Sequence, residues 1–294
     1  MTARRIPEIS RPEKVLFPDD GITKAELADY YRTVARRMLP HLRDRPLMLE
    51  RHPDGIGGHG FMQKEVPDHF PDWVHRVELP KEDGTVTYPV ADDTATLVYL
   101  AGQACITPHR FLSRADRPHH PDRMVFDLDP PGDDFTPVRE AARGLHGLLE
   151  ELGLPSLVMT TGSRGLHVVV ALDRRDDFDG VRAFARAVAD ALVARRPDRF
   201  TTEARKKARE GRLYLDVQRN AYAQTAVAPY AVRARPGAPV AAPLAWEDLD
   251  DPALDARRRT LRDADALLDE DPWHHPPRPR SLGRARTLLD ALTT

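Results

Sequence analysis

The chain has 294 residues, of which 41% are hydrophobic, so it is long enough to bury a substantial core. No apolar stretch approaches the roughly 18 residues that a membrane helix needs, and the first ten residues lack the apolar region of a signal peptide. The single cysteine, Cys105, excludes an internal disulfide and is expected to be buried as a small apolar residue, so we expect a cytoplasmic protein.

Hydrophobic periodicity predicts a mixed α/β fold with two lobes. Thr23 begins a predicted helix that ends at Leu42, because apolar residues recur there at helical spacing and Thr23 with Glu26 forms a capping-box pattern. Further helices are predicted over 93–104, 136–152, 180–195 and 281–292, strands over 46–51, 60–64, 73–79, 124–129, 156–160, 166–172 and 213–218, and a Pro-rich extended segment over 271–280. We expect a single domain over residues 1–294, with its core at about 14–250.

The net charge of −2 does not by itself indicate nucleic-acid binding, but the charge is unevenly distributed. Residues 203–235 contain eight Lys or Arg and three acids, a local charge of +5, whereas residues 244–271 contain ten acids and four Arg, a local charge of −6. A nearly neutral total can therefore include a basic face suited to a phosphate backbone. An ordinary solvated surface can also fluctuate this much.

Acidic residues follow an apolar run in the sequence Met-Val-Phe-Asp-Leu-Asp, residues 124–129. Because side chains alternate along a strand, Asp127 and Asp129 are predicted to share one face. Two adjacent carboxylates repel each other unless a cation lies between them, and hard oxygen ligands suit Mg²⁺ or Mn²⁺. Asp216, in another apolar strand, is a third candidate ligand. The alternatives are that Asp-Leu-Asp is a surface turn and that Asp216 forms an ion pair with the basic stretch.

A Gly-containing turn connects two predicted strands in Thr-Thr-Gly-Ser-Arg-Gly-Leu-His, residues 160–167. Glycines let backbone N–H groups approach an anion, Thr161 and Ser163 add hydroxyl groups, and Arg164 and His167 add donors suited to phosphate. The alternative is a plain β-hairpin turn. The order of acidic strand, this loop, basic stretch and third acid favours nucleotidyl transfer with two metal ions.

Longer blocks of the sequence resemble a known family. The blocks are KVLFPDDGITKAELADYY (14–31), FMQKEVPDHFPDWV (61–74), ITPHRFLSRADRPHHPDRMVFDLDPP (106–131), TTGSRGLHVVV (160–170), REGRLYLDVQRN (209–220) and QTAVAPYAVRARPGAPVAAPLAW (224–246). In this order they resemble the polymerase domain of the bacterial DNA ligases of non-homologous end joining (ligase D), a branch of the archaeo-eukaryotic primase superfamily. The resemblance implies a two-lobed α/β primase-polymerase core whose antiparallel or mixed sheet carries the catalytic acids.

The resemblance also implies roles for individual residues. Two Mn²⁺ or Mg²⁺ ions are expected at the catalytic residues Asp127, Asp129 and Asp216. The nucleoside triphosphate is expected to bind His109, Thr161, Ser163, Arg164, His167, Arg209, Arg233 and Arg235. DNA with a 5′-phosphate is expected to bind Lys14, Lys24, Arg51, Phe61 and Lys64.

At some positions the chain departs from the family pattern. Thr161 and Arg164 stand where Ser and Lys are usual, and both changes keep the chemistry. Met62 stands where a second aromatic is frequent, Arg219 where Gln is frequent, and Glu50 where a basic residue is common, which puts one DNA contact in doubt.

These features predict a repair polymerase that adds ribo- or deoxynucleotides to a primer 3′-hydroxyl at short gaps or broken ends. The expected partners are gapped or broken duplex DNA, a DNA ligase and a Ku-type end-binding protein, in the cytoplasm at the bacterial nucleoid. We interpret the chain as a stand-alone relative of this family. Two alternatives remain: a metal-dependent phosphodiesterase that uses the same acids, and a non-catalytic DNA-end-binding module.

Overall fold

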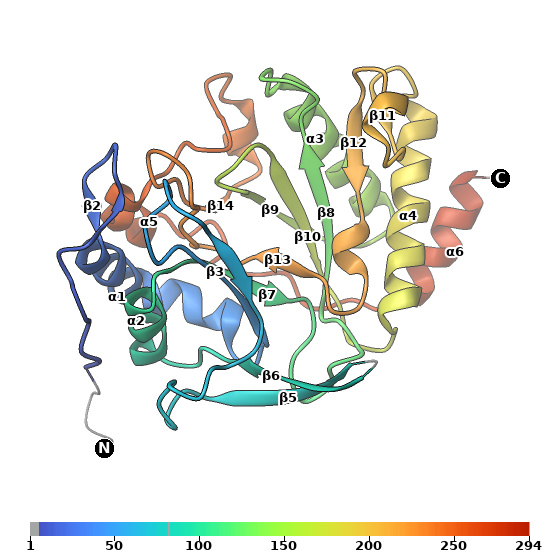
Figure 1. Ribbon diagram of the computed structural model, residues 1–294. Helices are drawn as coiled ribbons and strands as arrows, with labels where there is room; N and C mark the ends of the chain where they lie inside the picture. Colours follow the sequence, from blue (N-terminus) through green and yellow to red (C-terminus); the bar gives the residue numbers. More distant parts are fainter. Residues whose placement is uncertain (1–5, 82, 294) are drawn as a thin grey trace. The chain divides into compact units, whose positions relative to one another are not determined.

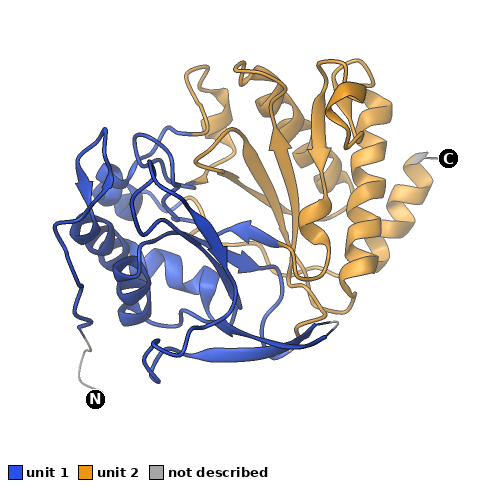
Figure 2. Cartoon of the chain, in the orientation of Figure 1, with its two compact units in different colours: residues 1–116, 225–242, 257–271 blue, residues 117–224, 243–256, 272–294 orange. Residues whose placement is uncertain are grey.

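The computed structural model describes residues 6–81 and 83–293, which form two compact units (Figures 1 and 2). Unit 1 comprises residues 1–116, 225–242 and 257–271, and unit 2 comprises 117–224, 243–256 and 272–294. They correspond to the two lobes expected from the sequence. None of the helices in the described part of the chain has the length and hydrophobicity that a membrane crossing needs.

A six-stranded mixed sheet organises unit 2. Its strands, in spatial order, are β11 (Phe200–Thr201), β12 (Leu213–Asp216), β8 (Arg123–Asp129), β10 (Leu166–Ala171), β9 (Ser156–Thr160) and β14 (Pro243–Leu244). The β11–β12 pair is parallel and the other pairs are antiparallel. The central strand β8 therefore has β12 on one side and β10 on the other, which fixes the register of the strand that carries two of the acids.

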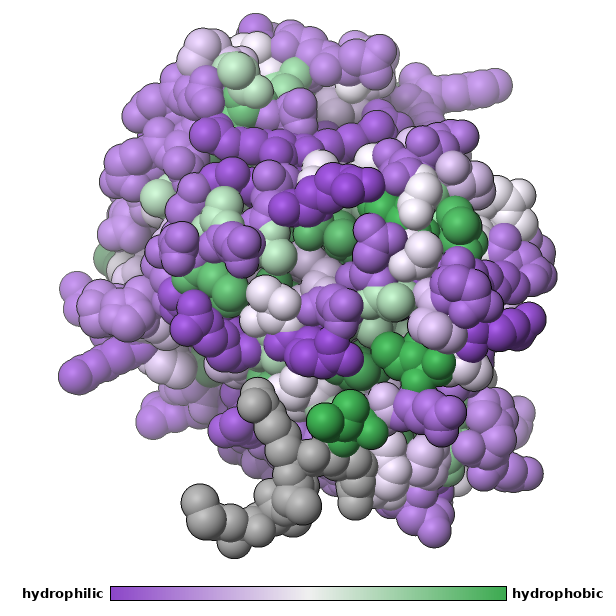
Figure 3. All heavy atoms as spheres, turned by 90° about the vertical axis from the view of Figure 1, so that its left-hand side faces the viewer, coloured by the Kyte–Doolittle hydropathy of each residue, from purple (hydrophilic) through white to green (hydrophobic). Residues whose placement is uncertain are grey.

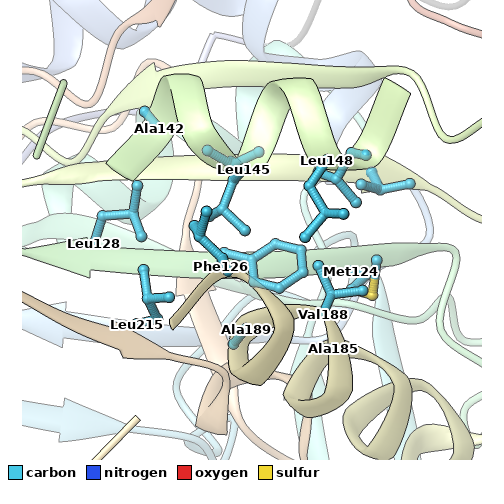
Figure 4. Packing of buried hydrophobic residues seen from close by; sticks show 14 of the residues in the cluster. Met124, Phe126, Leu128, Ala142, Leu145, Leu148, Ala185, Val188, Ala189 and Leu215 are labelled. Carbon is cyan, nitrogen blue, oxygen red and sulfur yellow. The ribbon is translucent and has the colours of Figure 1, made fainter. Parts of the chain in front are cut away.

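One face of this sheet builds the core of unit 2. Met124, Phe126 and Leu128 of β8 point toward two helices (Figure 4). The helices and 3₁₀ turns of unit 2 are α3 (Thr136–Glu151), α4 (Phe178–Arg195), α6 (Leu282–Thr293), η1 (Lys206–Ala208), η2 (Gln218–Asn220) and η3 (Glu247–Asp250). Leu145 of α3 and Val188 of α4 belong to the same buried cluster. Because strand side chains alternate, the apolar residues on this face leave the acids on the other.

In its described residues, unit 1 contains a four-stranded antiparallel sheet, a β-hairpin, a short strand pair and three α-helices. The sheet has the order β13 (Thr225–Val227), β7 (Cys105–Phe111), β3 (Leu47–Arg51) and β4 (Phe61–Gln63). The other elements are β1 (Val15–Phe17), β2 (Ile22–Thr23), β5 (Arg76–Lys81), β6 (Gly84–Pro89), α1 (Lys24–Leu42), α2 (Thr94–Gly102), η4 (Leu261–Asp263) and α5 (Ala264–Asp269). Thr23 caps α1 through the predicted capping box with Glu26. Cys105 is buried, as expected.

Several element boundaries differ from those predicted. The strand predicted over 73–79 begins only at Arg76, because Val74 N–H donates to the Pro71 carbonyl in a turn that precedes β5. The strand predicted over 213–218 ends at Asp216, where η2 begins after Val217. The helix predicted over 180–195 begins earlier, at Phe178. The sequence interpretation missed β1, β2, β6, β7, β11, β13 and β14.

The surface that includes the early part of unit 1 is mostly hydrophilic, with separate hydrophobic patches (Figure 3). Large apolar side chains that are exposed in unit 1 include Ile6, Val15, Phe61 and Met62. Phe61 and Met62 are adjacent on β4, an edge strand of the four-stranded sheet. Because side chains alternate along a strand, these two residues expose apolar surface on opposite faces of the sheet, and single exposed apolar residues are ordinary on protein surfaces.

Candidate functional site

Three acids meet on the face of the unit 2 sheet opposite the core. Asp127 of β8 is the cross-strand partner of Asp216 of β12, and Asp129 lies two residues further along β8. The same register that pairs Leu128 with Leu215 on the core side therefore brings the three carboxylates together. Asp127 is 5% exposed, Asp216 is half-buried and Asp129 is exposed.

His167 lies beside these acids, on the other side of β8. It is the cross-strand partner of Asp127 on β10, and its Nε2 atom lies 3.5 Å from Asp127 Oδ1. On the second oxygen, Arg219 Nε donates a 3.2 Å hydrogen bond to Asp127 Oδ2. Burial opposes ionisation of Asp127, but His167 and Arg219 outweigh it and lower the pKa of this carboxyl group. Asp127 is therefore a carboxylate at neutral pH.

Asp129 has the opposite electrostatic environment. Asp129 as a whole is exposed to solvent, yet enough protein surrounds its carboxyl group to desolvate it. This desolvation, followed by the charge of Asp127, raises the pKa of Asp129. The raised pKa therefore reflects burial first and repulsion from Asp127 second. A cation bound beside Asp129 would relieve this repulsion.

The loop between β9 and β10 is organised around Thr161. Its Oγ1 atom accepts hydrogen bonds from the backbone N–H groups of Ser163, Arg164 and Gly165, at 3.2–3.3 Å. The sequence suggested that such amides would approach an anion directly; here they are directed at the Thr161 side chain. Arg164 Nη2 donates to the Pro130 carbonyl at 2.8 Å, directly after the acidic strand. The loop is thus attached to the end of β8.

Gly165 is required for this attachment. A Cβ atom at this position would lie 1.8 Å from the backbone carbonyl oxygen of Leu128, between the two acids of β8. Gly162 has a φ of +62°, a conformation that glycine adopts without strain. The two glycines of the loop therefore serve different needs, a close backbone approach at Gly165 and a left-handed turn at Gly162.

Arg209 and Tyr214 extend the site along β12. Tyr214 is the cross-strand partner of Asp129, and its hydroxyl group donates to Asp216 Oδ1 at 3.4 Å. The guanidinium carbon of Arg209 lies 4.1 Å from the centre of the Tyr214 ring, in a cation–π contact. The sequence interpretation missed Tyr214, although its position two residues before Asp216 places it on the same face of the strand.

Asn220 was also missed, and it is fully buried. Its Oδ1 accepts from the Val125 N–H at 2.9 Å, and its Nδ2 donates to the carbonyls of Val125 and Val217 at 2.7 and 2.9 Å. The backbone N–H of Gln218 donates to Asp216 Oδ1 at 2.7 Å. These bonds attach η2, and with it Arg219, to both acidic strands. No periodic pattern in the sequence indicates this role for Asn220.

The remaining predicted nucleotide-binding residues lie in unit 1. His109 is on β7, and its Nε2 atom lies 3.4 Å from Glu50 Oε2. Burial alone would raise the pKa of Glu50, but its hydrogen bond with His109 and the charges of His109 and Arg233 hold the pKa at about 2. Arg235 follows Arg233 in a tight turn, where its N–H donates to the Arg233 carbonyl.

Predicted DNA-binding residues also gather in unit 1. Lys24, the first residue of α1, is 4% exposed, and its Nζ donates to the Ser10 carbonyl at 2.7 Å. Burial, and then the charges of Arg11 and Lys14, lower the pKa of Lys24. Lys14 Nζ lies 2.9 Å from Asp54 Oδ1. Cations therefore collect at the start of α1, where a helix N-terminus also favours an anion.

Arg51, Phe61 and Lys64 lie on or next to the edge of the four-stranded sheet. Arg51 donates to the Gln103 carbonyl and to Gln63 Oε1, and its guanidinium carbon lies 5.5 Å from the centre of the Phe61 ring. Phe61 is 39% exposed, and Lys64 is exposed just after β4. An exposed ring backed by a fixed cation is suited to stacking on a nucleic-acid base.

The acids of unit 2 provide the type of ligand that Mg²⁺ or Mn²⁺ requires. Three carboxylates on one face are hard oxygen donors. Within residues 6–81 and 83–293, however, no group of three or more His, Cys, Asp or Glu side chains is arranged tightly enough to hold a metal ion. The oxygen donors suit such an ion by their chemistry. Side chains must rearrange before it binds, because both oxygens of Asp127 already have neighbours.

Comparisons with known proteins identify relatives over most of the chain. The family described as LigD, primase-polymerase domain, matches residues 23–273. Multifunctional non-homologous end joining DNA repair protein LigD of Mycobacterium tuberculosis H37Rv is 35% identical over 97% of this chain, and the corresponding protein of Pseudomonas aeruginosa is 34% identical over 90%. The matches cover 39% and 32% of these two relatives, so the chain spans about a third to two fifths of their length.

A solved structure gives the same result. The polymerase domain from Mycobacterium tuberculosis ligase D in complex with DNA matches with a TM-score of 0.86 and 33% sequence identity. The match covers 92% of this chain and 96% of that domain. The fold, the sequence match and the family match agree: this chain belongs to the ligase D primase-polymerase domain family.

Proposed function

We propose that this chain is a metal-dependent nucleotidyl transferase that extends a DNA primer by copying a template at short gaps or broken ends. The observation that carries the proposal is the row of Asp129, Asp127 and Asp216 on one sheet face, directly next to the β9–β10 loop. The family, whose named relatives are non-homologous end-joining proteins, supports the same function. A DNA ligase and a Ku-type end-binding protein are the proposed partners, in the cytoplasm at the nucleoid.

Each group has a proposed part in the reaction. Asp127, Asp129 and Asp216 would hold two Mn²⁺ or Mg²⁺ ions, which activate the attacking 3′-hydroxyl and stabilise the departing pyrophosphate. Ser163, Arg164 and His167 would bind the triphosphate, in a loop whose shape depends on Thr161. This loop is attached to β8 through Gly165 and Arg164, so the triphosphate would be bound close to the acids.

The residues of unit 1 would contribute binding. His109, Arg233 and Arg235 would contribute nucleotide-binding groups, as would Arg209 in unit 2. Lys14 and Lys24 would bind the 5′-phosphate on the far side of the gap, where the buried ammonium of Lys24 gains a counter-ion. Arg51, Phe61 and Lys64 would contact the template strand through stacking and charge. Ribo- and deoxynucleotides are proposed as substrates, with a preference for ribonucleotides, and Mn²⁺ is proposed to support the activity well.

Extension of a labelled primer across a short gap with a 5′-phosphate tests this function. The wild-type protein with Mn²⁺ should add nucleotides, and comparison of ribo- with deoxynucleotides identifies the preferred sugar. The double variant Asp127→Ala, Asp129→Ala should lose at least about 10³-fold in rate, because removal of the metal ligands removes the main catalytic groups. Asp198→Ala is a matched control, since Asp198 is an exposed acid of the same unit, 3.9 Å from Arg196.

Two other outcomes would refute the polymerase function. Degradation of the DNA with metal and without nucleotide would indicate a phosphodiesterase. Equal, tight DNA binding by the wild type and the double variant without any extension would indicate a binding module. For the phosphate site, Lys14→Gln with Lys24→Gln should abolish the preference for a 5′-phosphorylated gap, and Lys81→Gln, on an exposed hairpin, should retain it.

A further inference from the structure

Arg219 contacts the acidic row of Asp129, Asp127 and Asp216, but it has no part in the proposed reaction. Its Nε atom donates to Asp127 Oδ2 at 3.2 Å, while His167 lies 3.5 Å from Asp127 Oδ1. Both oxygens of the most buried of the three acids therefore have a neighbour before any metal ion arrives. A metal ion that binds Asp127 must take the place of one of these neighbours or share an oxygen with it.

The backbone of Arg219 is fixed, whereas its side chain has access to solvent. Asn220 attaches η2 to β8 through Val125, and Gln218 attaches it to Asp216. The side chain of Arg219 is 43% exposed and that of Asp127 is 7% exposed. The guanidinium group can therefore leave Asp127 and enter water at little cost, whereas Asp127 cannot leave the site.

The charges explain what this arrangement achieves. Asp127, Asp129 and Asp216 carry up to three negative charges on one sheet face, and Arg219 offsets one of them without a metal ion. His167 cannot substitute for Arg219 as a group that moves away, because its side chain is only 4% exposed. An arginine is always protonated, so its competition with a metal ion persists at every physiological pH.

We propose that Arg219 is a built-in cation that competes with the metal ion for Asp127 and so sets the metal concentration at which the site fills. In the metal-free protein it stabilises the acidic row. When the ion binds, the guanidinium group is displaced toward solvent. Arg219 acts in this way only if the proposed metal-dependent polymerase function is correct.

Direct Mn²⁺ binding tests the competition without any reaction. The free Mn²⁺ signal in electron paramagnetic resonance gives the dissociation constant for the wild type, Arg219→Gln and Arg219→Lys. Loss of one positive charge at roughly 5 Å from a divalent ion in a solvated site corresponds to about a tenfold change in affinity. Arg219→Gln should therefore bind Mn²⁺ about tenfold more tightly, and Arg219→Lys should stay near the wild type.

Arg182→Gln is the matched control. Arg182 is on α4 of the same unit, its side chain is 44% exposed, and its acid partner is the exposed Asp179. This variant should bind Mn²⁺ as the wild type does. A second measurement is thermal stability: Arg219→Gln should be less stable than the wild type without metal and should gain more on addition of Mn²⁺, a response that a purely structural role would not give.

The outcomes separate the two proposals. In one outcome the wild type binds Mn²⁺ and Arg219→Gln binds it no more tightly. That result would overturn the role of Arg219 and leave the polymerase function intact. Failure of the wild type and of Arg219→Gln to bind Mn²⁺ at millimolar concentration would overturn the metal site, and the role of Arg219 with it. Tighter binding by both Arg219→Gln and Arg182→Gln would show a general charge effect and would also overturn the specific role.

Discussion

Replacement of Gly165 by alanine should disrupt both stability and the acidic row. The added Cβ would lie 1.8 Å from the carbonyl oxygen of Leu128, whereas such atoms need at least 3.0 Å. The backbone must therefore shift by about 1.2 Å, because neither atom belongs to a flexible side chain. A shift of this kind in a packed core costs about 1–3 kcal/mol. Leu128 lies between Asp127 and Asp129, so the shift also displaces the proposed metal ligands.

Two measurements check this expectation. Urea unfolding followed by circular dichroism should show a lower free energy of unfolding for Gly165→Ala, and primer extension should be slower by about 10²-fold, since a displacement of about 1 Å is sufficient for such a loss. The control is Gly147→Ala, at an exposed site of α3 where a Cβ meets nothing within 4 Å. Alanine should stabilise the helix there by up to about 1 kcal/mol. Wild-type stability and rate in Gly165→Ala would refute the reasoning.

Two further predictions concern buried polar groups. Asn220→Ala should lower the free energy of unfolding by about 3 kcal/mol, because it leaves backbone groups of Val125 and Val217 without partners. Urea titration measures this change, and a loss below about 1 kcal/mol would contradict the expectation. Glu50 has a pKa of about 2 in the folded state against an ordinary 4.5, so it contributes stability above pH 4.5 that is lost as the pH falls toward 2. The stability difference between the wild type and Glu50→Gln should therefore shrink by about 1–2 kcal/mol between pH 6 and pH 3, allowing for solvent screening near His109, and a constant difference would contradict the assignment.

The acidic strand was predictable because its residue alternation and the prolines that follow it both indicate a strand that ends near Asp129. Alternating apolar and acidic residues before two prolines predicted a strand with Asp127 and Asp129 on one face, and the structure has β8 over Arg123–Asp129. The apolar run of β10 gave an equally clear signal. The pairing of Asp127 with Asp216 could not be predicted, because register between strands far apart in the chain depends on the packing of the whole sheet.

Other elements escaped prediction for identifiable reasons. The strand β7 contains Pro108, and a proline inside an apolar run argues against a central strand; here its carbonyl still accepts from the Ala228 N–H at 3.2 Å. The end of β12 was extended too far because Val217 and Gln218 continue the alternation of apolar and polar residues that Leu215 and Asp216 begin. The contact of Arg219 with Asp127 follows from η2, whose turn is set by the buried Asn220 rather than by any local propensity.

The central position of β8 makes the proposed activity depend on the register of the sheet. Because side chains alternate with a period of two, pairing of β8 one residue out of register would turn Asp127 and Asp129 toward α3 and α4 and turn Phe126 and Leu128 away from them. Such a molecule would be both unstable and without the acidic row. The fraction of molecules that bind a metal ion at the proposed site therefore cannot exceed the fraction with a correctly registered sheet.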